Sequence, residues 1–119
     1  MLKIREEQLE TLSADSVRRF EQRMIRLLQT RWPVQTKDRA DSDLLSWVQQ
    51  AALKAAGYGI VSESDVERFL LWAWPRGLNL EELPPLAWAV QILHDHHFSP
   101  TEKLNELDNY EAIMERRSP

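Results

Sequence analysis

Apolar residues recur at helical spacing along almost the whole chain, and this pattern predicts a series of short helices. The first complete stripe follows i, i+3, i+7 spacing and consists of Val17, Phe20, Met24, Leu27 and Leu28. Ser13 or Asp15 is placed to cap the start of this helix, and Pro33 ends it because the residue before a proline avoids helical geometry. Upstream, Ile4, Leu9 and Leu12 fit a short leading helix or an N-terminal extension of the same one.

Two further helices are expected in the middle of the chain. Residues 33–41 are polar and predict a loop, after which Asp41 or Ser42 begins a second helix. Its inward positions are Leu44, Leu45, Val48, Ala51, Ala52 and Ala55. Gly57 and Gly59 favour a helix end, and Ser62 is placed to cap a third helix that stops before Pro75. The inner face of the third helix is Val66, Phe69, Leu70 and Ala73.

The last third of the chain predicts a turn-rich connector over residues 75–84 and two more helices. Pro85 suits the first position of a fourth helix, whose inward residues are Leu86, Ala89, Val90 and Leu93. The segment Ser99-Pro100-Thr101-Glu102 has the composition of a capping box and begins the last helix. That helix carries along one side Leu104, Leu107, Glu111 and Met114, with Tyr110 beside them.

No segment alternates like a strand, and no heptad persists. The sequence therefore predicts an all-α fold, in which residues 1–119 form a single compact domain of about five short helices in an irregular orthogonal bundle. A chain of 119 residues with 43% hydrophobic and 29% charged residues is ordinary for one globular domain. It has no cysteine, no apolar run near the roughly 20 residues that span a bilayer, and no apolar stretch behind Met1 typical of a secretory signal. We expect a cytoplasmic protein without a membrane partner.

The net charge of −4 is unevenly distributed, because residues 1–39 hold nine Lys/Arg against six Asp/Glu. A basic first third raises the question of nucleic acid. However, its helical arginines (Arg18, Arg19, Arg23 and Arg26) are interleaved with Asp15 and Glu21, which favours a solvated helix face with local ion pairs. A helix-turn-helix around Gly57-Tyr58-Gly59 would present Glu63 and Glu67 to phosphate, which repels them. The sequence therefore predicts no nucleic-acid partner.

Catalytic and metal-binding patterns are weak. His94, His96 and His97 lie near a predicted helix end, where imidazoles complement the negative end of the helix dipole; neither HExxH nor an accompanying ExxH motif joins them. The adjacent carboxylates Glu6-Glu7 and Glu81-Glu82 diverge, and neither a G-x-S-x-G elbow nor a glycine-rich phosphate loop occurs. We therefore expect neither an enzyme nor a resident metal or cofactor.

The aromatic residues favour protein binding. Each helical residue turns by about 100°, so Trp72 and Trp74 point roughly 200° apart. One ring can face the core, and the other is then directed to solvent or to a partner. Trp47 and Trp88 fit a core position, and Trp32, ahead of Pro33, fits a wedge between helices.

Three segments resemble a family of small bacterial proteins encoded beside PAAR spike-tip proteins, adaptor chaperones and effectors of type VI secretion systems. The first spans residues 4–9 (Ile-Arg-Glu-Glu-Gln-Leu) with Arg19-Phe20 and Arg23-Met24; the second spans residues 58–69; the third joins residues 88–93 to residues 99–104. The acidic-aromatic stretch usual after the third helix is here Trp74-Pro75-Arg76-Gly77, a departure from the family pattern.

The resemblance implies an accessory or co-chaperone protein that holds an effector or its adaptor before delivery. We expect it to cover apolar surface on its partner with a groove built around Phe69, Trp72, Trp74 and Trp88. Alternatives are an immunity protein that blocks a toxin, a small DNA-binding regulator and a metal-responsive helical protein. Dimerisation through the same aromatic residues stays open.

Overall fold

The computed structural model describes the backbone of residues 14–117 and the side chains of residues 14–114. Over this range the α-helices are, in chain order, α2 (Ala14–Arg31), α3 (Pro33–Thr36), α4 (Asp41–Gly57), α5 (Glu63–Ala73), α6 (Ala87–Leu93) and α7 (Pro100–Arg117). Two 3-10 turns, η1 (Leu80–Glu82) and η2 (Pro84–Leu86), precede α6. No strand occurs among these residues, and the predicted all-α fold is confirmed. The leading helix predicted around Ile4, Leu9 and Leu12 lies outside the described residues.

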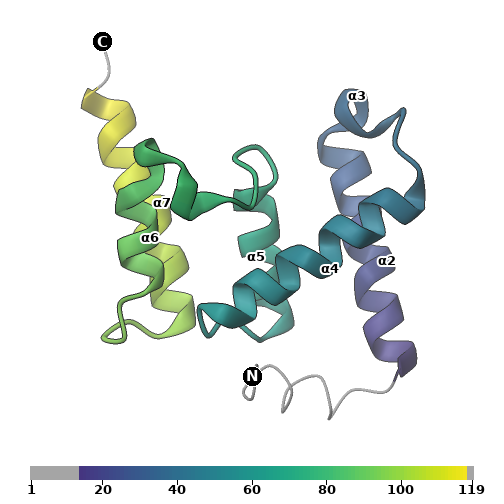
Figure 1. Ribbon diagram of the computed structural model, residues 1–119, viewed down its shortest axis with the longest axis horizontal. Helices are drawn as coiled ribbons and strands as arrows, with labels where there is room; N and C mark the ends of the chain where they lie inside the picture. The colour runs from purple at the N-terminus through teal and green to yellow at the C-terminus, as the bar shows by residue number, and fades with distance from the viewer. Residues whose placement is uncertain (1–13, 118–119) are drawn as a thin grey trace.

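The helices form a flat array that is 45 × 36 × 22 Å in extent. The smallest dimension is about twice the diameter of one helix with its side chains, which corresponds to two layers. Figure 1 shows α2 at one end of the long axis and α6 with α7 at the other, while α4 crosses diagonally between them in front of α5. Helix α5 contacts α2, α4 and α7, so it is the central element of the fold. Within residues 14–117, no helix is both long and apolar enough to traverse a bilayer.

The core follows the predicted inward stripes. On α4 and α5 the fully or almost fully buried apolar residues are Leu44, Val48, Ala51, Ala55, Val66, Phe69, Leu70 and Ala73. Leu45 and Ala52, also predicted to face inward, are only partly buried. On the remaining helices the predicted residues Met24, Leu28, Ala89, Leu93, Leu104 and Leu107 are buried, together with Ile25, which was not predicted. The predicted residues that are only partly buried there are Val17, Phe20, Leu27, Leu86 and Val90. Helical periodicity alone therefore locates most of the residues that hold the array together.

Two helix starts have the predicted caps. Ser62 Oγ accepts a hydrogen bond from the backbone N–H of Asp65 at 3.3 Å, and this bond caps α5. At α7, the N–H of Glu102 donates to Ser99 Oγ at 3.2 Å, while Glu102 Oε1 accepts from the N–H of Ser99 at 2.7 Å. This reciprocal pair is the capping box that the sequence indicates. Between α4 and α5, Gly59 takes φ of 81°, a conformation that glycine adopts without the steric cost of a side chain.

Three sequence expectations are corrected. The segment expected to be a loop over residues 33–41 begins with helix α3, because Pro33 is tolerated in the first turn of a helix. With this four-residue helix there are six α-helices over the described residues, in agreement with the expected number of about five short helices. Pro85 lies in η2, and α6 begins only at Ala87. Met114, which was expected on the inner side of the last helix, is 46% exposed because α7 continues beyond the core.

Candidate functional site

Trp72 and Trp74 lie on opposite sides of the C-terminal end of α5, as their spacing predicts. Trp72 is 8% exposed and its ring contacts those of Phe69 and Trp88, toward α6 and α7. Trp74 is half-buried, and its ring contacts those of Trp32 and Trp47, toward α2 and α4. The expectation that the second ring is left for solvent or a partner is met only in part, because two other indoles cover much of it.

The three indoles of Trp32, Trp47 and Trp74 form a cluster at the α3 end of the molecule. Trp74 lies 6.0 Å from Trp32 and 4.9 Å from Trp47, measured between ring centroids. Its Nε1–H donates to Gln35 Oε1 at 2.9 Å, and the guanidinium of Arg39 lies 5.5 Å from its ring centroid. This cluster joins the segment around α3 to α4 and α5. These contacts indicate that Trp74 has a structural role, in which it stabilises the packing of these segments against one another.

A second aromatic group continues from the core to the surface on the other side of α5. The ring of Trp88 stacks on that of Tyr110 with a centroid distance of 4.4 Å and an interplanar angle of 13°. Tyr110 is 38% exposed, and Ile113 and Met114 are each 46% exposed. These three α7 residues have i, i+3, i+4 spacing and therefore share one side of the helix. We call Trp88, Tyr110, Ile113 and Met114 the α6–α7 face.

Glu111 fixes how α7 presents this face. Its Oε1 accepts a hydrogen bond from Trp72 Nε1 at 2.9 Å, and its Oε2 forms an ion pair with Arg76. Arg76 also donates from Nη1 to the carbonyl of Trp72 at 2.6 Å, and its guanidinium lies 4.5 Å from the Trp72 ring centroid. Because Glu111 is held toward α5, Tyr110 and Ile113, which lie well away from it around the helix, are turned outward.

A polar network around Tyr58 positions η1 and α7. Tyr58 Oη donates to Glu81 Oε2 at 2.6 Å, and Lys54 Nζ lies 2.5 Å from Glu81 Oε1. Lys103 is 6% exposed, and its Nζ donates to the carbonyl of Tyr58 at 2.8 Å. Burial, together with the hydrogen bond to Glu81, raises the pKa of the Tyr58 hydroxyl. Burial also lowers the pKa of the Lys103 ammonium.

The pKa of the Glu81 carboxyl predicts an acid-sensitive contribution to stability. Partial burial raises this pKa, but hydrogen bonds from Lys54 and Tyr58 outweigh burial and lower it to about 2. Because this pKa is lower in the folded chain than in the unfolded chain, the ionised Glu81 carboxylate stabilises the fold at pH values above about 4.5. This stabilisation is lost as the pH falls from about 4.5 toward 2. We expect the native chain to be more stable than Glu81→Gln by about 1 kcal/mol at neutral pH, because the side chain is partly solvated.

Urea unfolding of both proteins between neutral pH and the acid range measures this difference. The difference should shrink as the solution is acidified. A difference that stays constant or grows on acidification would contradict the assignment.

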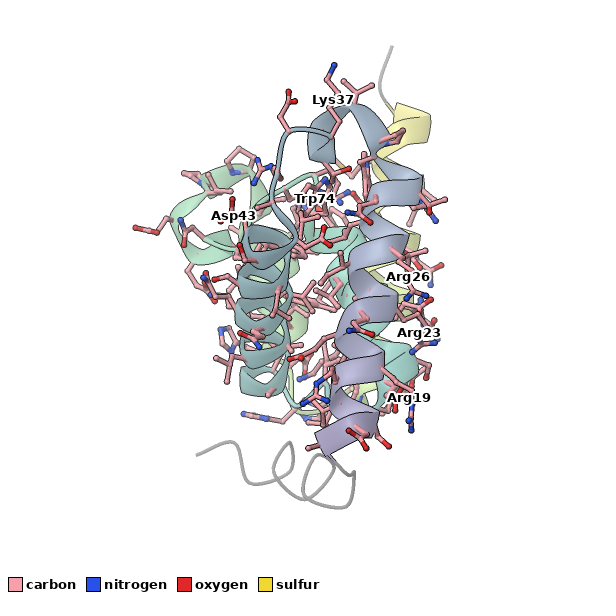
Figure 2. All side chains as sticks on the ribbon, turned by 90° about the vertical axis from the view of Figure 1, so that its right-hand side faces the viewer. Arg19, Arg23, Arg26, Lys37, Asp43 and Trp74 are labelled. Carbon is pink, nitrogen blue, oxygen red and sulfur yellow. The ribbon has the colours of Figure 1, made fainter. Side chains whose placement is uncertain are left out.

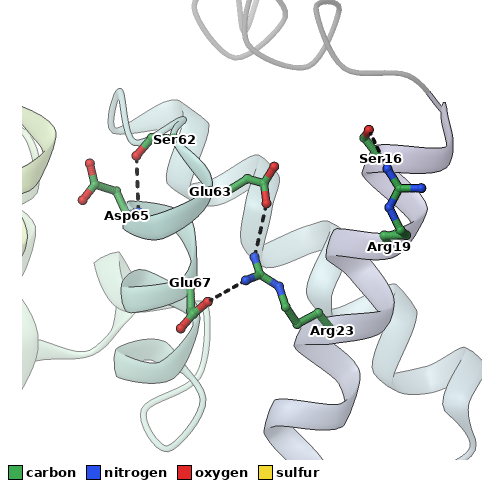
Figure 3. Close-up of polar contacts among 7 residues, drawn as sticks. All are labelled: Ser16, Arg19, Arg23, Ser62, Glu63, Asp65 and Glu67. Atoms are coloured by element: carbon green, nitrogen blue, oxygen red, sulfur yellow. Dashed lines mark hydrogen bonds and ion pairs between the residues drawn. The ribbon is translucent and has the colours of Figure 1, made fainter.

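The arginines of α2 form a row along one side of the helix, where Arg19, Arg23 and Arg26 are labelled in Figure 2. Arg23 reaches across to α5, with Nη2 lying 3.2 Å from Glu63 Oε1 and Nη1 lying 3.7 Å from Glu67 Oε1 (Figure 3). Arg18 pairs with Asp15 at 3.4 Å within the helix. The pair of Arg18 with Asp15 is the local kind that the interleaved charges predict, whereas Arg23 pairs across to α5.

The three histidines lie at the end of α6 and in the segment after it. His94 is the C-cap residue of α6, and its ring lies 5.3 Å from that of Tyr58, edge to face. His97 Nδ1 lies 2.9 Å from Asp95 Oδ1, and the same oxygen accepts from the His97 N–H. Over residues 14–117, no three His, Asp or Glu side chains are grouped closely enough to hold a metal ion.

The four residues predicted to form one binding groove lie in two separate groups. Phe69 is fully buried, and Trp72 is almost fully buried with its ring edge-on to that of Trp88, so these two offer little surface to a partner. Trp88 reaches the α6–α7 face, whereas Trp74 belongs to the indole cluster. Sequence reasoning missed Tyr110, Ile113 and Met114 as surface residues. The i, i+3 spacing of Tyr110 and Ile113, on the side of the helix away from Leu104 and Glu111, is the signal that points to these two; no such signal marks Met114.

An apolar hollow lies elsewhere, between α2, α4 and the start of α5. Its apolar lining includes Val17, Phe20, Ala52, Ile60 and Val61, and none of the four predicted aromatic residues contributes to it.

Comparisons of the chain with protein-family models, with curated proteins and with solved structures found no match.

Proposed function

We propose that this protein is a non-catalytic accessory or co-chaperone protein that holds a type VI secretion effector, or the effector's adaptor, before delivery. The observation that carries the binding part of this proposal is the α6–α7 face. Six large apolar residues are well exposed within the described part of the chain, and three of them lie on one side of one helix: Tyr110, Ile113 and Met114. Clustered apolar surface of this kind is typical of a protein-binding site. The type VI assignment rests on the sequence resemblance.

The face has the composition of an interface anchor. Trp88 and Tyr110 are large rings with few rotatable bonds, so a partner that covers them loses little conformational entropy. Their stacking fixes both rings before binding, and Glu111 holds the helix beneath them. Preorganised aromatic residues of this kind contribute most of the binding energy in many interfaces.

Co-purification with the products of neighbouring genes tests the proposal. The tagged full chain is co-expressed separately with the product of each neighbouring gene, among which the proposal expects a PAAR protein, an adaptor chaperone or an effector. We expect one of them to co-purify with the native chain. The Ile113→Asp variant should bind this partner with an affinity that is lower by about 30-fold or more, because the substitution would bury a carboxylate at the interface.

Leu53→Asp is the matched control. Leu53 is 47% exposed on α4, away from the face, and Ile113 is 46% exposed. The control should bind like the native chain, and circular dichroism should show both variants folded. Recovery of no neighbouring product, or equal binding by Ile113→Asp and the native chain, would contradict the proposal.

Effector toxicity separates this function from that of an immunity protein. Cells that express the effector alone, or together with this chain, are compared for growth and for the amount of effector. An accessory protein should raise the amount of effector without neutralising it. Full protection at an unchanged amount of effector would assign an immunity function instead.

A further inference from the structure

The segment that leads to the exposed apolar residues of the α6–α7 face is acidic, and α7 then ends with Glu115, Arg116 and Arg117. Residues 87–114 contain five carboxylates, Asp95, Glu102, Glu106, Asp108 and Glu111, and a single lysine, Lys103. The lysine offers no charge to a partner, because it is 6% exposed and its Nζ donates to the Tyr58 carbonyl. A partner that approaches this end of the molecule therefore meets negative charge next to apolar surface.

Contacts within the chain neutralise only some of these carboxylates. Asp108 pairs with Arg68 at 2.9 Å, and Glu111 pairs with Arg76. Asp95 accepts from the backbone and ring of His97. Glu102 uses one oxygen to cap Ser99. For Glu106, no ion pair with any residue in the described range is present, so its charge is available to a partner.

Helix geometry places the available carboxylates beside the apolar residues. Glu102, Glu106 and Tyr110 are spaced at i, i+4, i+8, and Ile113 is three residues further on. At about 100° per residue these four positions fall within roughly 80° of one another around α7. An acidic row therefore leads directly into the exposed apolar residues along a single side of the helix.

Building on the proposed function, we infer that the α6–α7 face binds an amphipathic helix of the partner whose apolar stripe is flanked by Lys or Arg. The apolar stripe covers Trp88, Tyr110 and Ile113, and its basic residues lie against Glu102 and Glu106. The occupant is recognised by its side chains, because the backbone of α7 is already hydrogen-bonded within the helix. Its positive charges distinguish it from apolar segments that carry acidic or neutral flanks.

Other occupants fit this surface less well. Nucleic acid and anionic lipid carry the same sign of charge as Glu102 and Glu106, which repel them. A second copy that used the same face would place two acidic rows together. The basic side of α2 in a second copy has the complementary charge, but its Arg23 is already paired with Glu63 and Glu67.

Binding of two designed helical peptides to the full-length chain tests the inference. Both peptides carry the same leucine stripe, flanked in one by lysine and in the other by glutamate. Fluorescence anisotropy should show that the lysine peptide binds at least about tenfold more tightly than the glutamate peptide. Raising the salt concentration from about 0.05 to about 0.5 M should weaken its binding. Glu106→Lys should reduce the preference, whereas Leu53→Asp should leave it unchanged.

Three results would overturn the inference. The first is equal or tighter binding of the glutamate peptide. The second is that neither peptide binds; if Ile113→Asp still releases the co-purified neighbour, the proposed function stands and only the partner's chemistry is wrong. The third is a dimer in sedimentation analysis that Ile113→Asp dissociates, because the occupant would then be a second copy. If, in addition, no neighbouring gene product co-purifies with the native chain, the proposed function itself is rejected.

Discussion

Replacing Phe69 by alanine is expected to lower the free energy of unfolding by about 3–5 kcal/mol, the largest effect of any single substitution considered. The Phe69 side chain is fully buried on the central helix α5. Its ring centroid lies 5.9 Å from that of Tyr58 and 6.3 Å from that of Trp72. Alanine would leave a cavity among these rings and remove their contacts. Domains of this size have free energies of unfolding of about 5–15 kcal/mol, so the substitution would remove a large part of the protein's stability.

Urea unfolding followed by circular dichroism measures this loss. Phe69→Leu is the matched control, because it keeps an apolar side chain of similar size, and we expect it to cost only about 1–2 kcal/mol. A loss below about 1 kcal/mol in the alanine variant would place the ring outside the core and contradict the fold.

Replacing Glu111 by alanine is expected to cost about 1–3 kcal/mol and to loosen the second half of α7. The substitution removes the acceptor of Trp72 Nε1 and the ion-pair partner of Arg76. The side chains of Arg76 and Glu111 are 25% and 27% exposed, so the loss should lie below that of a fully buried pair. Because Glu111 holds the inner side of α7, the α6–α7 face should become mobile as well.

Amide hydrogen exchange and urea unfolding together test this role. Exchange should accelerate over residues 108–114 of Glu111→Ala. Glu111→Gln retains an acceptor for the indole N–H but not the charge, and should lose about half as much stability. Combining Glu111→Ala with Arg76→Ala should cost less than the sum of the single losses, because the two residues interact directly. Strict additivity, with unchanged exchange, would show that the pair does not hold the helix.

The sequence predicted the class of fold and most of its core correctly, because helical periodicity is a local property. Val66, Phe69, Leu70 and Ala73 share one side of a helix whatever that helix packs against. Caps are equally local, and Ser62, Ser99 and Glu102 make the expected backbone hydrogen bonds. Two of the errors involve proline. Pro33 follows the end of α2 at Arg31, as predicted, but it also begins α3. Pro85 lies in the 3-10 turn η2, and α6 begins only at Ala87.

The candidate site was predicted only in part. The opposite directions of Trp72 and Trp74 follow from helix geometry, but the partner of each ring does not. Trp74 meets Trp32 and Trp47 because α3 and α4 lie beside the end of α5, which no local pattern encodes. The exposure of Ile113 and Met114 likewise depends on where the core ends along α7.

The amino-acid sequence by itself determined where helices form, how they are capped and which side of each is apolar, since all three depend on residues within a few positions of one another. Only the tertiary structure decided which apolar side chains stay uncovered. That outcome depends on segments that are distant in the sequence: Trp88 of α6 packs against Trp72 of α5, while the ion pair of Glu111 with Arg76 leaves Tyr110 and Ile113 on the outer side of α7. Whether a side chain is exposed depends on how all the other helices pack around it, so the residues of a binding surface cannot be identified from local sequence alone.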